Sequence, residues 1–320
     1  MIMRRRAFIS FLGIMTVLPR FTSAETKRFM VGILVIGNRD PTSFVTAFMG
    51  EMKRLGYADG QDIRFELRSG EAGAGNLREL ADELVKAKAD VIVARLTPAV
   101  IAARDATSQI PIVMIGAGDP IGNGLVTSLA RPGGNVTGLG GLPELISKNV
   151  ELVRELLPSA KRLGVVANAP DPFTKSFLAQ IRIAAEKQRF ELNVVAAQDS
   201  YELAGSFHQI AADNVEAVVV QPSLPTKACA DLALAAHLPT VSPIETFTGD
   251  GGLLSYSGRT LEQIPLAAGY VDKILRGARP AELPVQLATQ FELKINLRTA
   301  KGLGLVIPPL ILARADEVIE

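Results

Sequence analysis

Residues 163–177 read LGVVANAPDPFTKSF, and residues 31–44 read VGILVIGNRDPTSF. In each stretch an apolar run ends near an asparagine and an Asp-Pro pair, and a helical pattern follows. Apolar runs without polar alternation are typical of strands that are buried on both faces of a parallel sheet. The repeat, about 130 residues apart, predicts two lobes that each begin with the same strand, turn and helix.

The residues between and after these two stretches continue the pattern, because strand-like runs alternate with helical patterns. A Gly/Pro-rich stretch at 131–143 separates the two series. The sequence therefore predicts an α/β fold with two doubly wound parallel-sheet lobes. The expected strands are 30–37, 63–67, 90–95 and 110–116 in the first lobe and 162–168, 192–197 and 217–222 in the second; the expected helices are 43–57, 76–89, 97–109, 174–190 and 200–214.

The N-terminal residues have the pattern of an export signal. Arg4, Arg5 and Arg6 precede an apolar run and small residues that end at Ala24, which predicts a signal peptide over 1–24. The twin-arginine and general secretory routes both fit the pattern. The apolar run is too short to span a bilayer, and no cysteine follows it for a lipid anchor, so we expect a periplasmic protein that is not lipid-anchored.

Charge and cysteine content exclude several classes of protein. Removal of residues 1–24 would change the formal charge from +1 to −3, because this segment holds four arginines and no acidic residue. A mildly acidic chain is a poor ligand for nucleic acid. Cys229 is the only cysteine, so the chain has no internal disulfide. The remaining 296 or so residues are enough for two domains of common size.

Polar residues follow the strand ends, where open α/β sheets bind their ligands. If the lobes face each other, residues 38–41 and 168–172 lie on opposite walls of one cleft, although Asx-Pro turns are also ordinary strand-to-helix connectors. Thr97 is expected to cap a helix with Pro98 at its first position, next to Arg95. Asp119-Pro120 ends another strand, with glycines that allow close backbone approach.

Signals for catalysis or a bound cofactor are weak. The glycines after 115 have neither the spacing nor the position of a dinucleotide fingerprint, and the sequence contains no phosphate-binding P-loop. His208 and His237 fall outside the strand ends, and no His/Cys cluster has metal-ligand spacing. We expect no enzyme activity, no cofactor and no metal.

Two long motifs carry a family resemblance. Residues 110–139, IPIVMIGAGDPIGNGLVTSLARPGGNVTGL, and 282–320, ELPVQLATQFELKINLRTAKGLGLVIPPLILARADEVIE, resemble the substrate-binding proteins of ABC importers whose better-known members bind tryptophan and related aromatic amino acids. The similarity covers essentially the whole chain. It implies a type I periplasmic-binding fold with a three-crossing hinge, a small-molecule ligand, and a membrane permease and a separate ATPase as partners. We expect a monomer.

The implied topology makes the lobes discontinuous. Residues 251–258 should return the chain to the first lobe, and 283–296 should carry it back to the second. The expected boundaries are 25–140 plus about 256–285 for lobe 1, and 141–255 plus about 286–320 for lobe 2.

The resemblance implies that the positions at which family members contact their ligand correspond to Thr97, Pro98, Asp119, Asn168 and Glu245 in this sequence. Aromatic amino-acid binders of the family have Thr-Asp-Asn where this chain has Pro222, Ser223 and Leu224, so an α-amino group loses an obvious counter-ion. Arg95 is a second departure, because relatives often have a small residue there. These departures suggest an aromatic or apolar carboxylate, with Arg95 and Arg39 on the carboxylate and Leu224 and Phe247 on the apolar part.

Other ligands and other roles stay open at this point. The expected ligand-binding residues are Asn38, Arg39, Asp40, Arg95, Thr97, Pro98, Asp119, Asn168, Ser223, Leu224, Glu245 and Phe247. Aromatic amino acids are the alternative ligand class, and both arginines could instead be solvated rim residues. A receptor module for signalling and a two-lobed enzyme are alternative roles, whereas a sugar-responsive repressor would carry a DNA-binding helix-turn-helix where this chain has the export signal.

Overall fold

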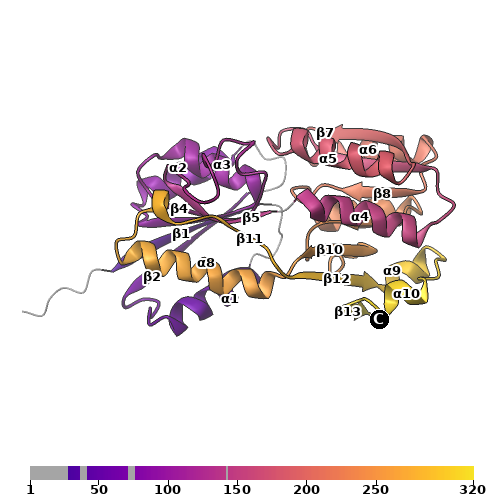
Figure 1. The fold of residues 1–320 in the computed structure, drawn as a ribbon. Helices are drawn as coiled ribbons and strands as arrows, with labels where there is room; N and C mark the ends of the chain where they lie inside the picture. The colour runs from indigo at the N-terminus through magenta and orange to yellow at the C-terminus, as the bar shows by residue number, and fades with distance from the viewer. Residues whose placement is uncertain (1–27, 37–41, 71–75, 142) are drawn as a thin grey trace, which may run out of the picture.

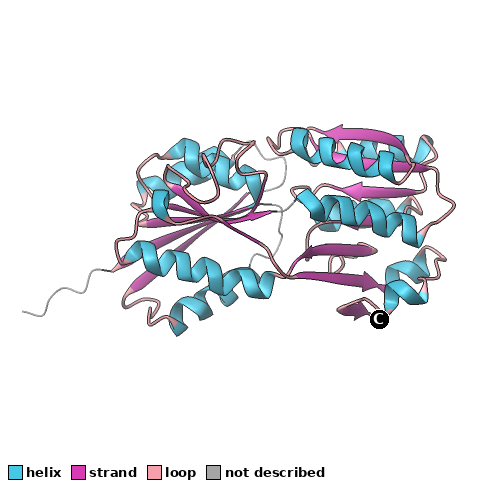
Figure 2. Cartoon of the chain, viewed as in Figure 1, coloured by secondary structure: helices cyan, strands magenta, loops and turns pink. Residues whose placement is uncertain are grey.

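A computed structural model describes residues 28–36, 42–70, 76–141 and 143–320. The predicted signal peptide and three of the predicted ligand contacts, Asn38, Arg39 and Asp40, lie outside these residues. The described chain forms two α/β lobes side by side (Figures 1 and 2).

The first lobe is built on a parallel sheet with the strand order β11-β5-β4-β3-β1-β2 among the described residues. β1 lies between β2 and β3 and pairs with both in parallel, so the strand order reverses beside β1, at the point where doubly wound sheets bind ligands. The strands are β1 (Phe29–Ile36), β2 (Ile63–Gly70), β3 (Val91–Arg95), β4 (Ile112–Gly118), β5 (Val136–Gly141) and β11 (Gln286–Leu287).

Helices cover both faces of this sheet. On one face β1 and the helices α1 and α8 bury a core that includes Val31, Ile33 and Phe48. On the other face α2 and α3 pack over Leu34 and Ile92. The strand residues alternate between the two cores because successive side chains point to opposite faces. The helices are α1 (Thr42–Arg54), α2 (Leu77–Lys86), α3 (Leu96–Ala106) and α8 (Thr260–Leu275), with a short 3-10 helix η1 (Pro280–Glu282).

The second lobe repeats this arrangement. Its sheet has the order β13-β12-β10-β9-β8-β6-β7 among the described residues, and β6 lies between β7 and β8 as β1 lies between β2 and β3. All pairs are parallel except β10 with β12. The strands are β6 (Arg162–Asn168), β7 (Glu191–Ala197), β8 (Ala217–Val220), β9 (Thr240–Ser242), β10 (Leu254–Gly258), β12 (Phe291–Asn296) and β13 (Glu317–Ile319).

Two helical layers also cover the second sheet. Val165 and Phe177 belong to the core on one face, whereas Val166, Phe207 and Cys229 belong to the core on the other. The prediction of two doubly wound lobes is therefore confirmed. The helices are α4 (Pro143–Leu156), α5 (Thr174–Lys187), α6 (Leu203–Ala212), α7 (Thr226–Ala235), α9 (Leu297–Gly302) and α10 (Pro309–Leu312).

The chain changes lobe in three places. β5 ends at Gly141 in the first sheet and α4 begins at Pro143 in the second lobe; α8 follows β10 and packs on the first lobe; β12 follows β11. The second and third changes lie slightly later than the sequence suggests. Residues 254–258 pair with β9 and β12, and Gln286 and Leu287 pair with β5.

The Gly/Pro-rich stretch at 131–143 contains a strand that the sequence pattern does not predict. Gly138 of β5 has φ of 120°, and a Cβ there would lie 2.4 Å from the Met114 carbonyl oxygen of β4. A glycine is needed for this close approach of the two strands. Glycine, which in the sequence suggests a linker, is therefore required here by the close packing of β5 against β4.

Among the described residues, no helix is both long and apolar enough to cross a membrane.

Candidate functional site

A cavity lies between the two lobes, at the carboxyl ends of their strands. Its first-lobe wall comes from the ends of β3, β4 and β5 and the start of α3. Its second-lobe wall comes from α4, from the segment between β6 and α5, and from the loops after β8 and β9. The cavity therefore occupies the position that strand topology favours for a ligand.

The structure brings five of the predicted residues to this cavity. They are Arg95, Thr97 and Asp119 from the first lobe and Ser223 and Glu245 from the second.

Asp171 also lines the cavity, and three hydrogen bonds fix its carboxylate. Ser223 Oγ donates to Oδ2 at 2.5 Å and Gln221 Nε2 donates to the same oxygen at 2.8 Å. The Phe173 backbone N–H donates to Oδ1 at 2.9 Å. Burial raises the pKa of Asp171 above its usual value, and the three donors oppose this shift by stabilising the charged form.

Asn168 is not among the residues that line the cavity. It contacts Asp171 indirectly, through the residues that hydrogen-bond to the Asp171 carboxylate. It is buried at the end of β6, where its Nδ2 donates to Ser223 Oγ at 3.0 Å. Its backbone N–H donates to Gln221 Oε1 at 2.9 Å. Asn168 therefore orients the two side chains that donate to Asp171, as residues behind a binding group do elsewhere.

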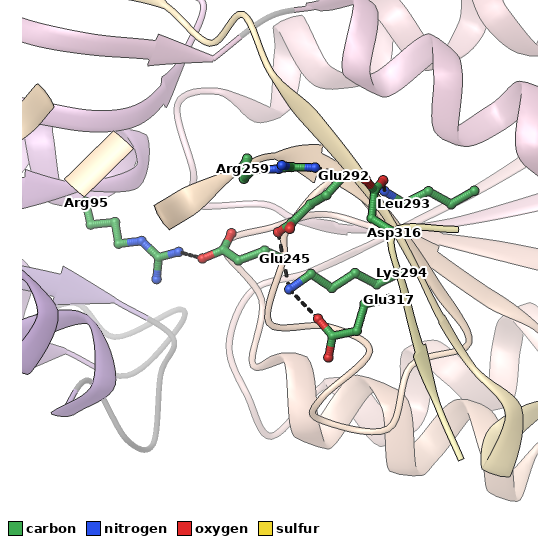
Figure 3. A network of polar contacts seen from close by, with 8 residues as sticks. All are labelled: Arg95, Glu245, Arg259, Glu292, Leu293, Lys294, Asp316 and Glu317. Atoms are coloured by element: carbon green, nitrogen blue, oxygen red, sulfur yellow. Dashed lines mark hydrogen bonds and ion pairs between the residues drawn. The ribbon is translucent and has the colours of Figure 1, made fainter. Parts of the chain in front are cut away.

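An ion pair joins the two lobes across the cavity. Figure 3 shows Arg95 reaching from the first lobe to Glu245 on the second, and the guanidinium Nη2 donates to Glu245 Oε1. The Arg95 guanidinium also lies over the ring of Phe44, 5.5 Å from its centroid. Arg95 is buried and is therefore not the solvated rim residue of one sequence interpretation, and Glu245 balances its charge in this arrangement.

A second polar contact crosses the cleft at Asp119. Ser176 of α5 donates from Oγ to Asp119 Oδ2 at 2.8 Å, and the Gly122 N–H donates to Oδ1 at 3.0 Å. Asp119 has φ of 44°, a left-handed conformation that aspartate tolerates better than most residues. Among the described residues, no basic side chain forms an ion pair with Asp119 or Asp171.

The start of α3 differs from the sequence prediction. The helix begins at Leu96, which has a positive φ of 65°, so Thr97 is its second residue and Pro98 its third. Thr97 is not the helix cap, because its Oγ1 accepts a hydrogen bond from the Gly118 N–H at 3.0 Å. This bond joins the helix to the end of β4. Pro98 is not among the residues that line the cavity.

Leu224 and Phe247 are placed differently from the prediction that they face the ligand. Leu224 is 3% exposed and Phe247 is fully buried, and both belong to the core beneath α6 and α7. Both side chains are packed among other large apolar side chains in this core. They are core residues of the second lobe and do not line the cavity.

The apolar wall comes from residues that were not among the expected ligand-binding residues. Phe173 directly follows the Asp-Pro pair of the repeated motif and Ser176 lies three residues further on, so the motif could have indicated them. The remaining members lie on a strand end, on loops and in the first turn of α4, where no local pattern marks them. This apolar wall includes Ile115, Leu145, Ile146, Phe173, Pro222, Pro243 and Ile244.

Within the described part of the chain, no three His, Cys, Asp or Glu side chains are grouped as a metal site requires.

Comparisons with known proteins agree with this architecture. The chain is 28% identical over 270 residues to a tyrosine-binding protein of Clostridioides difficile, a match that covers 81% of this chain and 75% of that protein. A conserved domain protein of Vibrio cholerae has a similar structure, with a TM-score of 0.84 and 27% identity over 92% of this chain and 99% of that one. An ABC domain from Streptococcus pneumoniae in complex with L-Trp has a TM-score of 0.82 and 25% identity over 92% of this chain and all of that one.

The type I periplasmic-binding fold implied by the sequence is confirmed by these neighbours and by the two-lobed topology. A family model for ABC transporter substrate binding proteins, which are solute-binding proteins rather than enzymes, matches residues 32–319. The chain therefore belongs to the ABC transporter substrate-binding protein family.

Proposed function

We propose that this protein is the exported solute-binding component of an ABC importer and that it binds an aromatic amino acid between its lobes. The bound ligand passes to a membrane permease, and a separate ATPase supplies the energy for transport. The predicted periplasmic location and the predicted signal peptide belong to this proposal.

The charge of the cavity carries the choice of ligand. Arg95 is neutralised by Glu245, whereas Asp171 faces the cavity without an ion-pair partner among the described residues. A ligand ammonium group supplies the missing positive charge, and a charge-assisted hydrogen bond to a fixed carboxylate is among the stronger polar contacts. This argues for a ligand with an amino group rather than for the simple carboxylate that the sequence suggested.

The rest of the cavity fits the other parts of an amino acid. Ile115, Leu145, Phe173 and Ile244 supply apolar surface for a side chain. The amino end of α3 also lines the cavity, and the amino end of a helix favours an anion such as the α-carboxylate. Aromatic ligands are favoured by the relatives, since one is named for tyrosine and another was solved with L-Trp.

Binding is coupled to a hinge movement in this proposal. A ligand that contacts Asp171 on one wall and the amino end of α3 on the other makes both sets of contacts only when the lobes are closed. The closed form therefore binds the ligand more tightly, and this difference in affinity drives closure.

Calorimetry with matched ligands tests the proposal. L-tryptophan and L-tyrosine are compared with their deaminated analogues, indole-3-propionate and 3-(4-hydroxyphenyl)propionate, on the refolded protein. We expect each amino acid to bind at least ~30-fold more tightly than its deaminated analogue, because that analogue leaves Asp171 unpaired. Equal or tighter binding of the deaminated acids would contradict the proposal and favour a carboxylate ligand.

A further inference from the structure

Arg95, the cationic side chain of the cavity, is paired with Glu245 of the other lobe. Among the described lining residues, Arg95 is the only Lys or Arg. Its side chain is 10% exposed and that of Glu245 is 17% exposed. Water therefore screens this pair weakly, and each charge depends strongly on the other.

The surroundings of Glu245 make its separation from Arg95 unfavourable. Burial raises the pKa of Glu292, the Lys294 ammonium opposes this rise, and the charge of the nearby Glu245 adds to it. Lys294 Nζ lies 3.2 Å from Glu292 Oε1 and also contacts Glu317, and Figure 3 shows this group behind Glu245. Glu245 thus has a cation on the cleft side and a carboxylate on the other side.

These contacts oppose a ligand carboxylate at Arg95. Such a group would have to compete with Glu245 for Arg95, and a displaced Glu245 carboxylate would stay partly buried beside Glu292, whose neighbour Lys294 already pairs with Glu292 and Glu317. Removing one partner from a buried ion pair is strongly unfavourable. Rejection of an unwanted ligand by a competing charge is a common source of specificity.

We infer that Glu245 is a specificity-determining residue that occupies Arg95 and thereby excludes ligands that carry a carboxylate but no amino group. This inference rests on the proposed function, because it assumes that the ligand binds in this cavity. It assigns to Glu245 a further share of the discrimination against aromatic carboxylates, beyond the share that comes from the ammonium contact to Asp171.

The test uses Glu245→Gln, which keeps the side-chain shape and removes the charge, and indole-3-propionate as the probe. Calorimetry should show that E245Q binds this acid at least ~10-fold more tightly than the wild-type protein does, because Arg95 becomes available to the carboxylate. Glu245→Ala is a second variant in which the same direction is expected. In the double variant R95Q/E245Q the gain should disappear.

Glu83→Gln is the matched control. Glu83 pairs with Arg68 at 2.6 Å on the exposed surface of the first lobe, so E83Q should bind the acid as the wild type does. Circular dichroism and thermal melting establish that each variant is folded.

The inference is overturned if folded E245Q and E245A bind indole-3-propionate no more tightly than the wild type, or if the double variant keeps the gain. These results are independent of the test of the proposed function. Absence of binding of both tryptophan and tyrosine to the wild type refutes the amino-acid proposal, whereas absence of a gain in the Glu245 variants refutes the role of Glu245.

Discussion

Asp171 shows how one residue can be prepared for a charged ligand. Its two oxygens accept three hydrogen bonds from Ser223, Gln221 and the Phe173 backbone, and Asn168 holds Ser223 in turn. The carboxylate is oriented before any ligand arrives, so less entropy is lost on binding. Burial raises the pKa of Asp171, and a nearby ammonium group would lower it again.

Asp171→Asn should weaken the binding of L-tryptophan by about 2–5 kcal/mol, because the ligand ammonium would lose its buried counter-ion. Isothermal titration calorimetry measures the change. Asp82→Asn, which alters an exposed pair with Arg78, should bind like the wild type. An unchanged affinity in the folded D171N variant would exclude Asp171 as the counter-ion.

The affinity for tryptophan should fall as the pH is lowered through the pKa of Asp171, because the protonated acid no longer pairs with an ammonium. The pKa is raised from 3.8, so the loss should begin at a higher pH than for an ordinary aspartate. The same raised pKa means that ionising Asp171 destabilises the ligand-free fold as the pH rises. Titrations between roughly pH 4 and 8 should show this dependence in the wild type, and D171N should lack it.

At the scale of elements, the end of β4 and the start of α5 meet closely across the cleft. Gly118 ends β4, and a Cβ at this position would lie 2.4 Å from carbon atoms of the Phe173 ring of the other lobe. Thr97 of α3 fixes the position of Gly118, because its hydroxyl oxygen accepts a hydrogen bond from the Gly118 N–H. The glycine is required for the approach of the two lobes rather than for a special backbone conformation.

Gly118→Ala should therefore hinder closure and weaken ligand binding by about ten-fold or more, since an added methyl group in a tight contact costs about 1–3 kcal/mol. The unfolding free energy should change less, because the lobes can separate to relieve the contact. Calorimetry and urea denaturation measure the two quantities.

Two further variants separate closure from general damage. Adding Phe173→Ala to G118A should recover part of the affinity, because the smaller side chain makes room for the methyl group. Gly134→Ala, at a position where an added Cβ meets nothing within 4 Å, should leave both quantities unchanged. A G118A protein with wild-type affinity would show that this contact does not limit closure.

At the scale of the whole molecule, two lobes are linked by crossings that also contact each other. The Arg259 N–H, directly after β10, donates to the Gln290 carbonyl at 3.0 Å, next to β12. Arg259 also pairs with Asp316 of the second lobe at 2.8 Å. Across the cleft, the lobes are joined by the Arg95–Glu245 pair and by the Ser176–Asp119 hydrogen bond. We expect the free energy of these contacts to determine whether the closed or the open arrangement of the lobes is favoured.

Arg95→Gln should shift this balance toward the open form, because Glu245 would be left unpaired in the closed form at a cost of about 3–5 kcal/mol. Small-angle X-ray scattering with saturating tryptophan should show a larger radius of gyration for R95Q than for the wild type. R95Q/E245Q, in which neither charge remains, should return toward the wild-type value. Identical scattering of R95Q and the wild type would mean that the pair does not stabilise closure.

Much of the architecture could be read from local patterns. Strands such as Val91–Arg95 are apolar throughout because both sheet faces are covered, and helices such as α1 carry a one-sided apolar stripe. The repeated Asp-Pro motif identified two equivalent lobes. The rule that ligands bind at strand ends then located Arg95, Asp119 and Ser223 on the cavity. These inferences succeed because backbone geometry and side-chain periodicity are properties of short segments.

The direction and the partner of each loop side chain depended on the folded molecule. Arg95 and Glu245 are 150 residues apart in the chain, and no local pattern pairs them. Leu224 and Phe247 turn into a core because apolar neighbours from α6 and α7 are there. The sequence offers no acidic residue after β8, and the counter-ion we propose, Asp171, follows β6, which is adjacent to β8 in the sheet. Long-range packing brings these groups together, and it is therefore the tertiary structure that determines the charge of the binding cavity.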